Sequence, residues 1–472
     1  MKVRLRRWRA KWCAPVLAGA LLCACTGHLP YREADLQEQA TPAQFQDRSA
    51  DDTSLADLVR AAGYDGQWPP QYWRLGTLTL LGLYFNPQVD VARAQAAASQ
   101  AALATAARRS PLSVELAAEH HSREVDDTPW TLGLAIGLPV GGASRREARV
   151  QQATFVADAA QIEIANSMWR VRGSIRDAVI DLLASTRRAR LLEQRLSTHR
   201  DLVQLLQRRV DAGMASAREL GRERTTMANV AAQLALEATA QASAWGALAR
   251  ALGLPLQTTR SLAIAEDALE QPDTVADAAL ARGNALRNRL DVYLRLLEFG
   301  AADAELRLAV AKQYPVVRVS PGFLWDQGDQ IWSLGSLLVP PASAKEAVRE
   351  AEARREVAAK QFSALQLDTI SEVERAREVL LAAKASVGAA QETLESAQAQ
   401  FQRIRRYFEA GGGDRLQLVT ARLEIVQARQ NLLDAQIATL AAAARFEDAM
   451  QLPILSDYIE LPGQPGKVAE AS

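Results

Sequence analysis

Two long stretches of the chain carry helical spacing with no proline to interrupt them. Residues 143–212 contain one glycine and no proline, and residues 343–410 also lack proline. As single helices they would extend about 105 Å and about 100 Å, at a rise of about 1.5 Å per residue. No ordinary globular core needs helices of that length, so the sequence predicts long antiparallel rods.

Apolar residues in these stretches and in the helices that return beside them recur every three or four positions. Such spacing is typical of coiled-coil seams. The first seam comprises Leu182, Ser185, Ala189, Leu192, Leu196, His199, Val203, Leu206 and Val210, and the second Leu416, Val419, Leu423, Val426, Gln430, Leu433, Ile437 and Leu440. A soluble helical bundle would explain these seams equally well.

Four shorter segments alternate large apolar residues with small or polar ones, which predicts strands. Each run has about 8 to 10 residues, close to the 9–11 of a tilted membrane strand. The alternation fits lipid on one face and water on the other, with Trp130, Trp325 and Trp332 in an aromatic girdle beside loops 120–129 and 326–331. Two soluble hairpins packed on helices would show the same pattern. The predicted lipid-facing residues are Leu112, Val114, Leu116, Trp130, Leu132, Leu134, Ile136, Val317, Val319, Phe323, Trp325, Trp332 and Leu334.

The number of predicted strands restricts how they can close. The smallest membrane barrels have about eight strands, and lipid tolerates no open sheet edge. If the four segments span a membrane, several chains must share one barrel. Three chains of four strands would supply twelve strands.

The two halves of the chain repeat one order of landmarks at an offset of 198 to 204 residues. The predicted order of elements in each half is helix, strand, strand, very long helix, Gly turn and return helix. This repeated order indicates duplication. The paired landmarks are 86–91 with 289–292, 110–111 with 314–315, 130–133 with 332–335, 211–213 with 409–411, and 252–255 with 450–453.

The first residues resemble a secretory signal with a bacterial lipobox. A basic stretch with six Lys and Arg residues precedes an apolar run that is too short to span a bilayer. The run ends in Leu22-Cys23-Ala24-Cys25, which predicts cleavage before Cys25 and acylation of Cys25. Thr26 at the next position fits sorting to the outer membrane. Cleavage would leave a mature net charge of 49 − 55 = −6, because the whole chain has 55 basic and 55 acidic residues.

The composition favours long helices seamed by small side chains over a thick core, because aromatic residues make up only 6% of the chain. Balanced charge implies no nucleic-acid partner. No phosphate loop, metal motif or nucleophile elbow is present, so we expect no enzyme activity, no cofactor and no metal site. His120 and His121 are interpreted as part of a solvated loop, and His199 as a register-setting polar residue of the first seam.

In order and duplicated, several motifs resemble the TolC-type outer-membrane efflux family, over roughly residues 73–453. They are Asn86-Pro87 with Ala92-Arg93-Ala94-Gln95, Trp130-Thr131-Leu132-Gly133-Leu134, Arg209-Val210-Asp211-Ala212-Gly213, Leu252-Gly253-Leu254-Pro255, Ala311-Lys312-Gln313-Tyr314-Pro315, Ala351-Glu352-Ala353-Arg354-Arg355 and Asp414-Arg415-Leu416. The segment Pro340–Ala344 is shorter than the Gly- and Asn-containing turn that such members usually carry.

The resemblance implies a mainly α fold with a small β part, assembled as a homotrimer with a twelve-stranded barrel and a periplasmic helical tunnel. It also implies a periplasmic adaptor and an inner-membrane pump, most simply of the RND type, as partners, and outer-membrane lipid around the barrel. The Gly turns would be adaptor-contacting tips, comprising Arg209, Asp211, Gly213, Glu409, Gly411, Gly412 and Gly413. They also serve as plain helix ends.

Asp414 and Arg415, just past the second tip, are candidates for a closed aperture. Three copies of Asp414 near an axis would repel unless Arg415 or Arg218 paired with them. An ordinary helix start with Asp at its N-terminus would look the same.

The expected domain organisation is a signal peptide (1–24), a lipid-anchored segment (25–72), a first repeat (73–257), a linker (258–278), a second repeat (279–453) and a flexible tail (454–472). The expected function is passive conduction through an outer-membrane exit duct of a tripartite efflux pump. The alternatives are the exit duct of a type I protein-secretion system and a non-channel coiled-coil scaffold lipoprotein.

Overall fold

The computed structural model describes residues 42–61, 64, 66–109, 111–120, 130–140, 142–267, 269, 275–326, 329–339 and 344–455. The chain forms two compact units, residues 1–48 and 49–472. In the first unit the described helix is α3 (Pro42–Gln46). The second unit holds all the other described elements.

The helices of the second unit follow the predicted duplicated order. Both long helices are continuous, and their ends agree with the expected stretches to within two residues. The helices are α4 (Thr53–Ala61), α5 (Leu75–Phe85), α6 (Pro87–Ala106), α7 (Ala143–Asp211), α8 (Ala217–Leu252), α9 (Leu256–Arg260), α10 (Ala278–Asn288), α11 (Leu290–Ala311), α12 (Ala344–Glu409) and α13 (Arg415–Met450).

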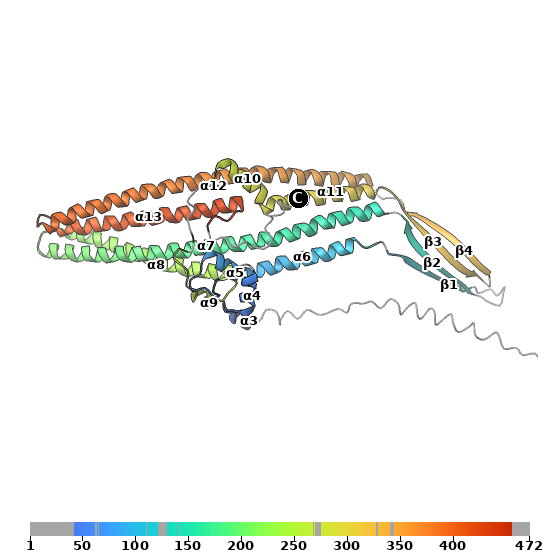
Figure 1. Cartoon of the computed structure of the whole chain (residues 1–472), viewed down its shortest axis with the longest axis horizontal. Helices are drawn as coiled ribbons and strands as arrows, with labels where there is room; N and C mark the ends of the chain where they lie inside the picture. Colours follow the sequence, from blue (N-terminus) through green and yellow to red (C-terminus); the bar gives the residue numbers. More distant parts are fainter. Residues whose placement is uncertain are drawn as a thin grey trace, which may run out of the picture. The chain divides into compact units, whose positions relative to one another are not determined.

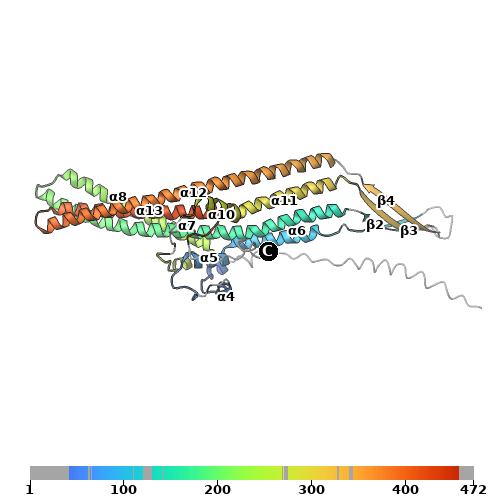
Figure 2. The same ribbon diagram turned by 45° about the horizontal axis from the view of Figure 1, so that its top comes forward.

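Two long hairpins dominate this unit. Helix α8 returns beside α7 and α13 returns beside α12, while α6 and α11 lie along the other halves of the long helices (Figure 1). The view in Figure 2 shows the same arrangement, with a small sheet at one end of the rods and the two hairpin turns at the opposite end. The predicted seams are confirmed: Leu192 and Leu206 lie in apolar clusters between the helices, and Leu433 of the second seam is also buried.

A four-stranded antiparallel sheet joins the helices at the start of each long rod. Its strands are β1 (Ser113–His120), β2 (Trp130–Val140), β3 (Val316–Asp326) and β4 (Asp329–Val339), and they lie in the order β1-β2-β3-β4. The predicted loop 326–331 is therefore too long, because the ladder continues to a pair between Asp326 and Asp329. His120 is also not a loop residue; it ends β1, with its ring 4.7 Å from that of Trp130.

The duplication extends to the ends of the return helices. Gly253 after α8 and Gln451 after α13 both adopt the left-handed conformation, with φ of 71° and 47°. At Gly253 a side chain would also meet the carbonyl oxygen of Phe85 at 2.4 Å. Each helix end is tied to the junction of the two shorter helices of its repeat: Asn86 donates to the carbonyl of Ala251 at 2.8 Å, and the side chain of Gln451 accepts from the N–H of Leu290.

The main core lies midway along the rods, where α4, α5, α7, α8, α12 and α13 meet. A buried ion cluster lies beside it. Glu447 of α13 is 0% exposed and accepts hydrogen bonds from Arg172 and Arg176 of α7. The cluster therefore fastens the end of α13 to the middle of α7.

Farther along α7, His199 is buried in the seam with α8. Its Nδ1 contacts the Glu223 carboxylate, whereas its Nε2 has no partner among the described residues. The buried seam position agrees with the expected register-setting role.

Candidate functional site

One face of the sheet is a continuous apolar surface. Leu116, Leu134, Phe323 and Trp332 are consecutive cross-strand partners, so they form one row over all four strands. Directly opposed residues of a ladder point to the same face. Every predicted lipid-facing residue within a strand falls on this face, which confirms the alternation; Leu112 lies just before β1 and continues the same face.

This apolar face is open in the single chain. Leu116, Trp332 and Leu334 are 76%, 79% and 76% exposed. Water-soluble proteins rarely expose contiguous apolar patches of more than a few hundred Å². The rods do not cover this face, so the hairpins are not packed on helices as the soluble alternative requires.

The opposite face of the sheet consists mostly of small and polar residues, most clearly on β1 and β2. It carries Glu115, Gly133, Ala135 and Ser333, with Arg318 nearer the helices. Leu324, Ile331 and Leu337 depart from this pattern: Leu324 packs where Gly133 has no side chain, and Ile331 and Leu337, on β4, are exposed. The two faces thus differ in the way that a wall between lipid and water requires.

The sheet also has two open edges. β1 pairs only with β2, and β4 only with β3, within the described chain. Unpaired backbone groups at a sheet edge are not tolerated in lipid, and in water they form a template for pairing with another strand. Both edges are therefore free to pair with further strands.

At the far end of the rods the two hairpin turns have the same geometry. Gly213 and Gly411 are left-handed, with φ of 72° and 81°. The N–H of Met214 donates to the carbonyl of Arg209 at 2.7 Å, and the N–H of Gly412 donates to that of Tyr407 at 3.1 Å. These are Schellman-type helix ends, so a non-glycine residue at either left-handed position would be strained.

The other two glycines of the second turn are needed for close approach. A side chain on Gly412 would meet the Tyr407 ring at 2.6 Å, and one on Gly413 would meet the backbone of Phe408 at 2.9 Å. Of the remaining predicted tip residues, Asp211 accepts from Gln207 and Glu409 accepts from Arg405, each within its own helix.

Asp414 connects the two hairpins, but not through the predicted partners. Its carboxylate accepts from the N–H of Leu416 at 3.0 Å, which caps α13, and from the Arg209 Nη2 of α7 at 2.5 Å. No ion pair within the described residues joins it to Arg415 or Arg218. Within the single chain the partner is Arg209 of the neighbouring hairpin, and this pairing depends on a helix register that spacing alone does not fix.

The hydrogen bond from the backbone N–H of Leu416 holds the pKa of Asp414 below its usual range, and the Arg209 guanidinium lowers the pKa further. Asp414 is therefore ionised at neutral pH. An apolar cluster supports the same junction, in which Leu416 and Val419 of α13 pack against Leu206 and Leu220. The tips thus combine a charged link with an apolar one.

Several expectations fall outside the described residues. They include the signal peptide, Cys25, the loop residues near His121 and the segment 340–343. In the part of the chain that the structure describes, no group of three His, Cys, Asp or Glu side chains is placed to hold a metal ion. No helix in that part has the length and apolarity needed to cross a membrane.

The chain matches the family model described as outer membrane efflux protein over residues 83–254 and 342–450, which together exceed half of its length. No curated protein matches it in a sequence search.

Several solved structures are similar to this fold. The outer membrane protein VceC from Vibrio cholerae is 19% identical, with a TM-score of 0.65, covering 82% of this chain and 100% of VceC. The CmeC outer membrane channel of Campylobacter jejuni is 12% identical, with a TM-score of 0.63, covering 90% and 93%. CusC, whose structures concern folding and transmembrane channel formation, is 18% identical, with a TM-score of 0.64, covering 82% and 94%. At these low sequence identities, the structural similarity shows the fold of the chain and nothing more specific.

Proposed function

The chain belongs to the outer membrane efflux protein family, and from that premise we propose that three copies form a passive exit duct of a tripartite efflux pump. The observation that supports the duct most strongly is the sheet. It has one exposed and wholly apolar row across all four strands, an opposite face of mostly small and polar residues, and two open edges. Three copies joined edge to edge, β4 of one to β1 of the next, would supply twelve strands and remove every edge.

The dimensions of the sheet agree with this assembly. An 11-residue strand such as β2 is about 36 Å long at about 3.3 Å per residue. Tilted by about 45°, it spans about 26 Å, which is the height of the apolar band of an outer-membrane barrel. Trp130 and Trp325 lie at the loop end of their strands, where an aromatic girdle is expected.

A matched pair of substitutions tests whether the apolar face contacts lipid. Leu134 and Ala135 are neighbours in the middle of β2 and point to opposite faces. Leu134→Arg should cost about 2–4 kcal/mol per chain near the bilayer midplane, and Ala135→Arg, facing water, much less. The readout is the fraction of chains in the outer membrane as heat-modifiable oligomers. Equal loss in both variants, or none in either, would contradict the lipid-facing assignment.

We further propose that the hairpin tips receive a periplasmic adaptor, through which an inner-membrane pump of the RND type supplies the energy. Gly213 and Gly411 fix tight reversals, and Met214 and Tyr407 beside them are 72% and 60% exposed. Exposed apolar and aromatic groups on rigid turns suit a protein contact. Met214→Asp should reduce co-purification with the adaptor without lowering the amount of outer-membrane oligomer; unchanged co-purification would contradict this contact.

The remaining parts of the proposal concern the N-terminus and the aperture. Acylated Cys25 would anchor each chain in the outer membrane, and residues 26–72 would tether or wrap the duct. The link between Asp414 and Arg209 would help to hold the tips closed, and Arg415 and Arg218 would be further residues of the closed aperture. No catalytic step, cofactor or metal is part of this function.

A further inference from the structure

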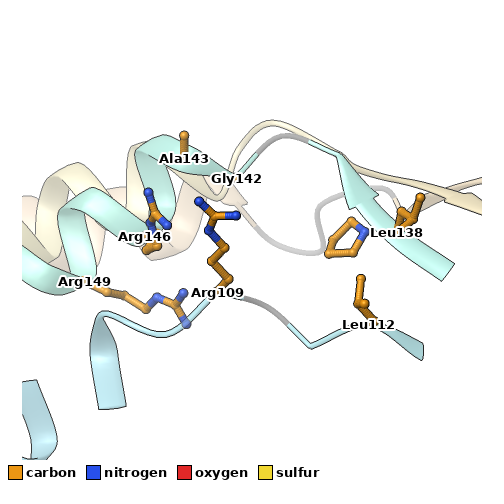
Figure 3. Close-up of a pocket in the computed structure, with 8 residues that line it drawn as sticks. Arg109, Leu112, Leu138, Gly142, Ala143, Arg146 and Arg149 are labelled. Atoms are coloured by element: carbon orange, nitrogen blue, oxygen red, sulfur yellow. The ribbon is translucent and has the colours of Figure 1, made fainter. Parts of the chain in front are cut away.

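The structure contains a cavity of about 340 Å³ where the sheet meets the first long rod. Two kinds of side chain line it. Arg109, from the segment after α6, and Arg146 and Arg149, from the start of α7, form one wall; Leu112, Leu138 and Pro139, at the strand ends, form the other. Figure 3 shows Arg109 and Arg146 pointing toward one another, with the leucines on the opposite side.

The three arginines are not paired with a carboxylate among the described residues. None forms an ion pair or a side-chain hydrogen bond with another described residue, although most arginines of the rods do. Arg145 provides the contrast, because its Nε donates to the carbonyl of Ala311 at 3.1 Å at the end of α11. Like charges that converge without a partner repel one another, and an anion among them would remove that cost.

The local backbone adds to the positive potential. The first turn of α7 has no acidic residue and no side-chain cap, and Gly142 and Ala143 form part of the cavity wall. Cations near a helix N-terminus are unfavourable, whereas an anion there is favourable. The helix N-terminus contributes less to the positive potential than the three guanidinium groups do.

The two leucines of the apolar wall belong to the exposed apolar face of the sheet, whereas Pro139 pairs with Arg318 on the opposite face. Leu138 pairs with Val319 on the apolar face, and Leu112 precedes β1 on the same side. The cavity lies at the helix end of the sheet, opposite the loops that carry Trp130 and Trp325. In the proposed duct this is the level at which the barrel leaves the membrane on the periplasmic side. An occupant must therefore be anionic on one side and apolar on the other.

We propose that this cavity binds the phosphate of a membrane glycerophospholipid, whose acyl chains lie along the apolar face of the sheet. Arg109, Arg146 and Arg149 hold the phosphate, and Leu112 and Leu138 contact the first methylenes. The site rests on the proposed function, because it requires the apolar face to be in lipid. It would fix the depth of the barrel in the bilayer.

The test compares three preparations of the full chain in a mild detergent. One is unchanged, one carries Arg109→Gln, Arg146→Gln and Arg149→Gln, and one carries only Arg108→Gln. Arg108 is exposed and adjacent to Arg109 but does not line the cavity. Each preparation is titrated with dioleoylphosphatidylglycerol, and separately with dioleoylglycerol or inorganic phosphate. Bound molecules per assembly are counted by native mass spectrometry, and planar-bilayer conductance is recorded for each.

The triple variant should bind the phospholipid about a hundredfold more weakly, since each basic residue near an anionic surface contributes about a factor of five. The Arg108→Gln variant should keep the unchanged affinity, and neither dioleoylglycerol nor inorganic phosphate should bind comparably. Tight inorganic phosphate binding would instead indicate a plain anion site and overturn the lipid assignment.

Two other outcomes would also overturn the proposal. Equal phospholipid affinity in all preparations, with conductance intact, would contradict the lipid site but not the proposed duct. Equal affinity with no conductance in any preparation would contradict both proposals. If the triple substitution breaks the assembly into single chains without changing phospholipid affinity, the arginines pair with a sister subunit instead.

Discussion

Replacing Glu447 by alanine should destabilise the protein strongly, because this carboxylate is the centre of a buried ion cluster. Its Oε2 accepts from the N–H groups of Ile454 and Leu455 at 2.8 and 2.9 Å, and its Oε1 accepts from Arg176 at 2.9 Å and from Arg172. The two arginine side chains are only 1% and 4% exposed. Removing one partner of a buried pair costs about 3–5 kcal/mol, since the opposite charge stays buried.

This cost can be converted into a melting temperature. At about 2.1 cal/mol/K per residue, the unfolding entropy of the 472-residue chain is about 1 kcal/mol/K. Glu447→Ala should therefore lower the Tm by about 3–5 °C, measured by circular dichroism in detergent. Asp448→Ala is the matched control: Asp448 pairs with Arg176 but is 43% exposed, so its loss should cost about 1 kcal/mol or less. Equal Tm shifts in the two variants would refute the reasoning.

The same carboxylate predicts a pH dependence. Burial alone would raise the pKa of Glu447, but the hydrogen bond from Arg172 and the charges of Arg172 and Arg176 outweigh it and lower the pKa below its ordinary value of 4.5. A carboxylate with a lowered pKa in the folded state stabilises the fold above its ordinary pKa, and that stability is lost as the pH falls through the folded-state value. The Tm of the unchanged protein should therefore fall more steeply below about pH 4.5 than that of Glu447→Gln. Parallel pH profiles would contradict this assignment.

Three further predictions concern the turns and the N-terminus. Gly253→Ala should destabilise the folded protein by about 2–4 kcal/mol, because a side chain strains the left-handed backbone and would also meet Phe85. Gln451→Gly should change the stability of the protein by less than about 1 kcal/mol, because relief of the same backbone strain offsets the loss of one hydrogen bond. Thermal melts check both, and equal effects would refute the comparison. Asp414→Ala should raise bilayer conductance or antibiotic leakage, and an unaltered channel would remove Asp414 from the aperture. Cys25→Ser should abolish palmitate labelling, and retained label would rule out that residue as the anchor.

The elements of the fold were predictable from local spacing. A period of two places Trp130, Leu132, Leu134 and Ile136 on one face of β2, and the same holds within each of the other strands; the pairing register then joins the apolar faces of the four strands. Apolar residues that recur every three to four positions, with no proline between them, predict the long helices. Each of these patterns is complete within one segment, which is why they could be identified.

The charged contacts were not predictable, because each joins segments far apart in the chain. Arg209 and Asp414 are separated by 205 residues, and Arg172 and Glu447 by 275. Which of many surface charges meet depends on how far one rod slides along the next, and apolar seams of small residues tolerate several such positions. Arg415 and Arg218 were therefore plausible partners for Asp414 that the structure does not use.

The central claim is that sister chains complete the open sheet within a lipid bilayer. The most direct measurement is the mass of the purified protein in detergent, followed by conductance recording of the same particles in a planar bilayer. The account predicts particles of three chains that insert and conduct in discrete steps. A stable water-soluble particle of one chain, with Leu134 and Trp332 open to aqueous labels and no conductance, would contradict it.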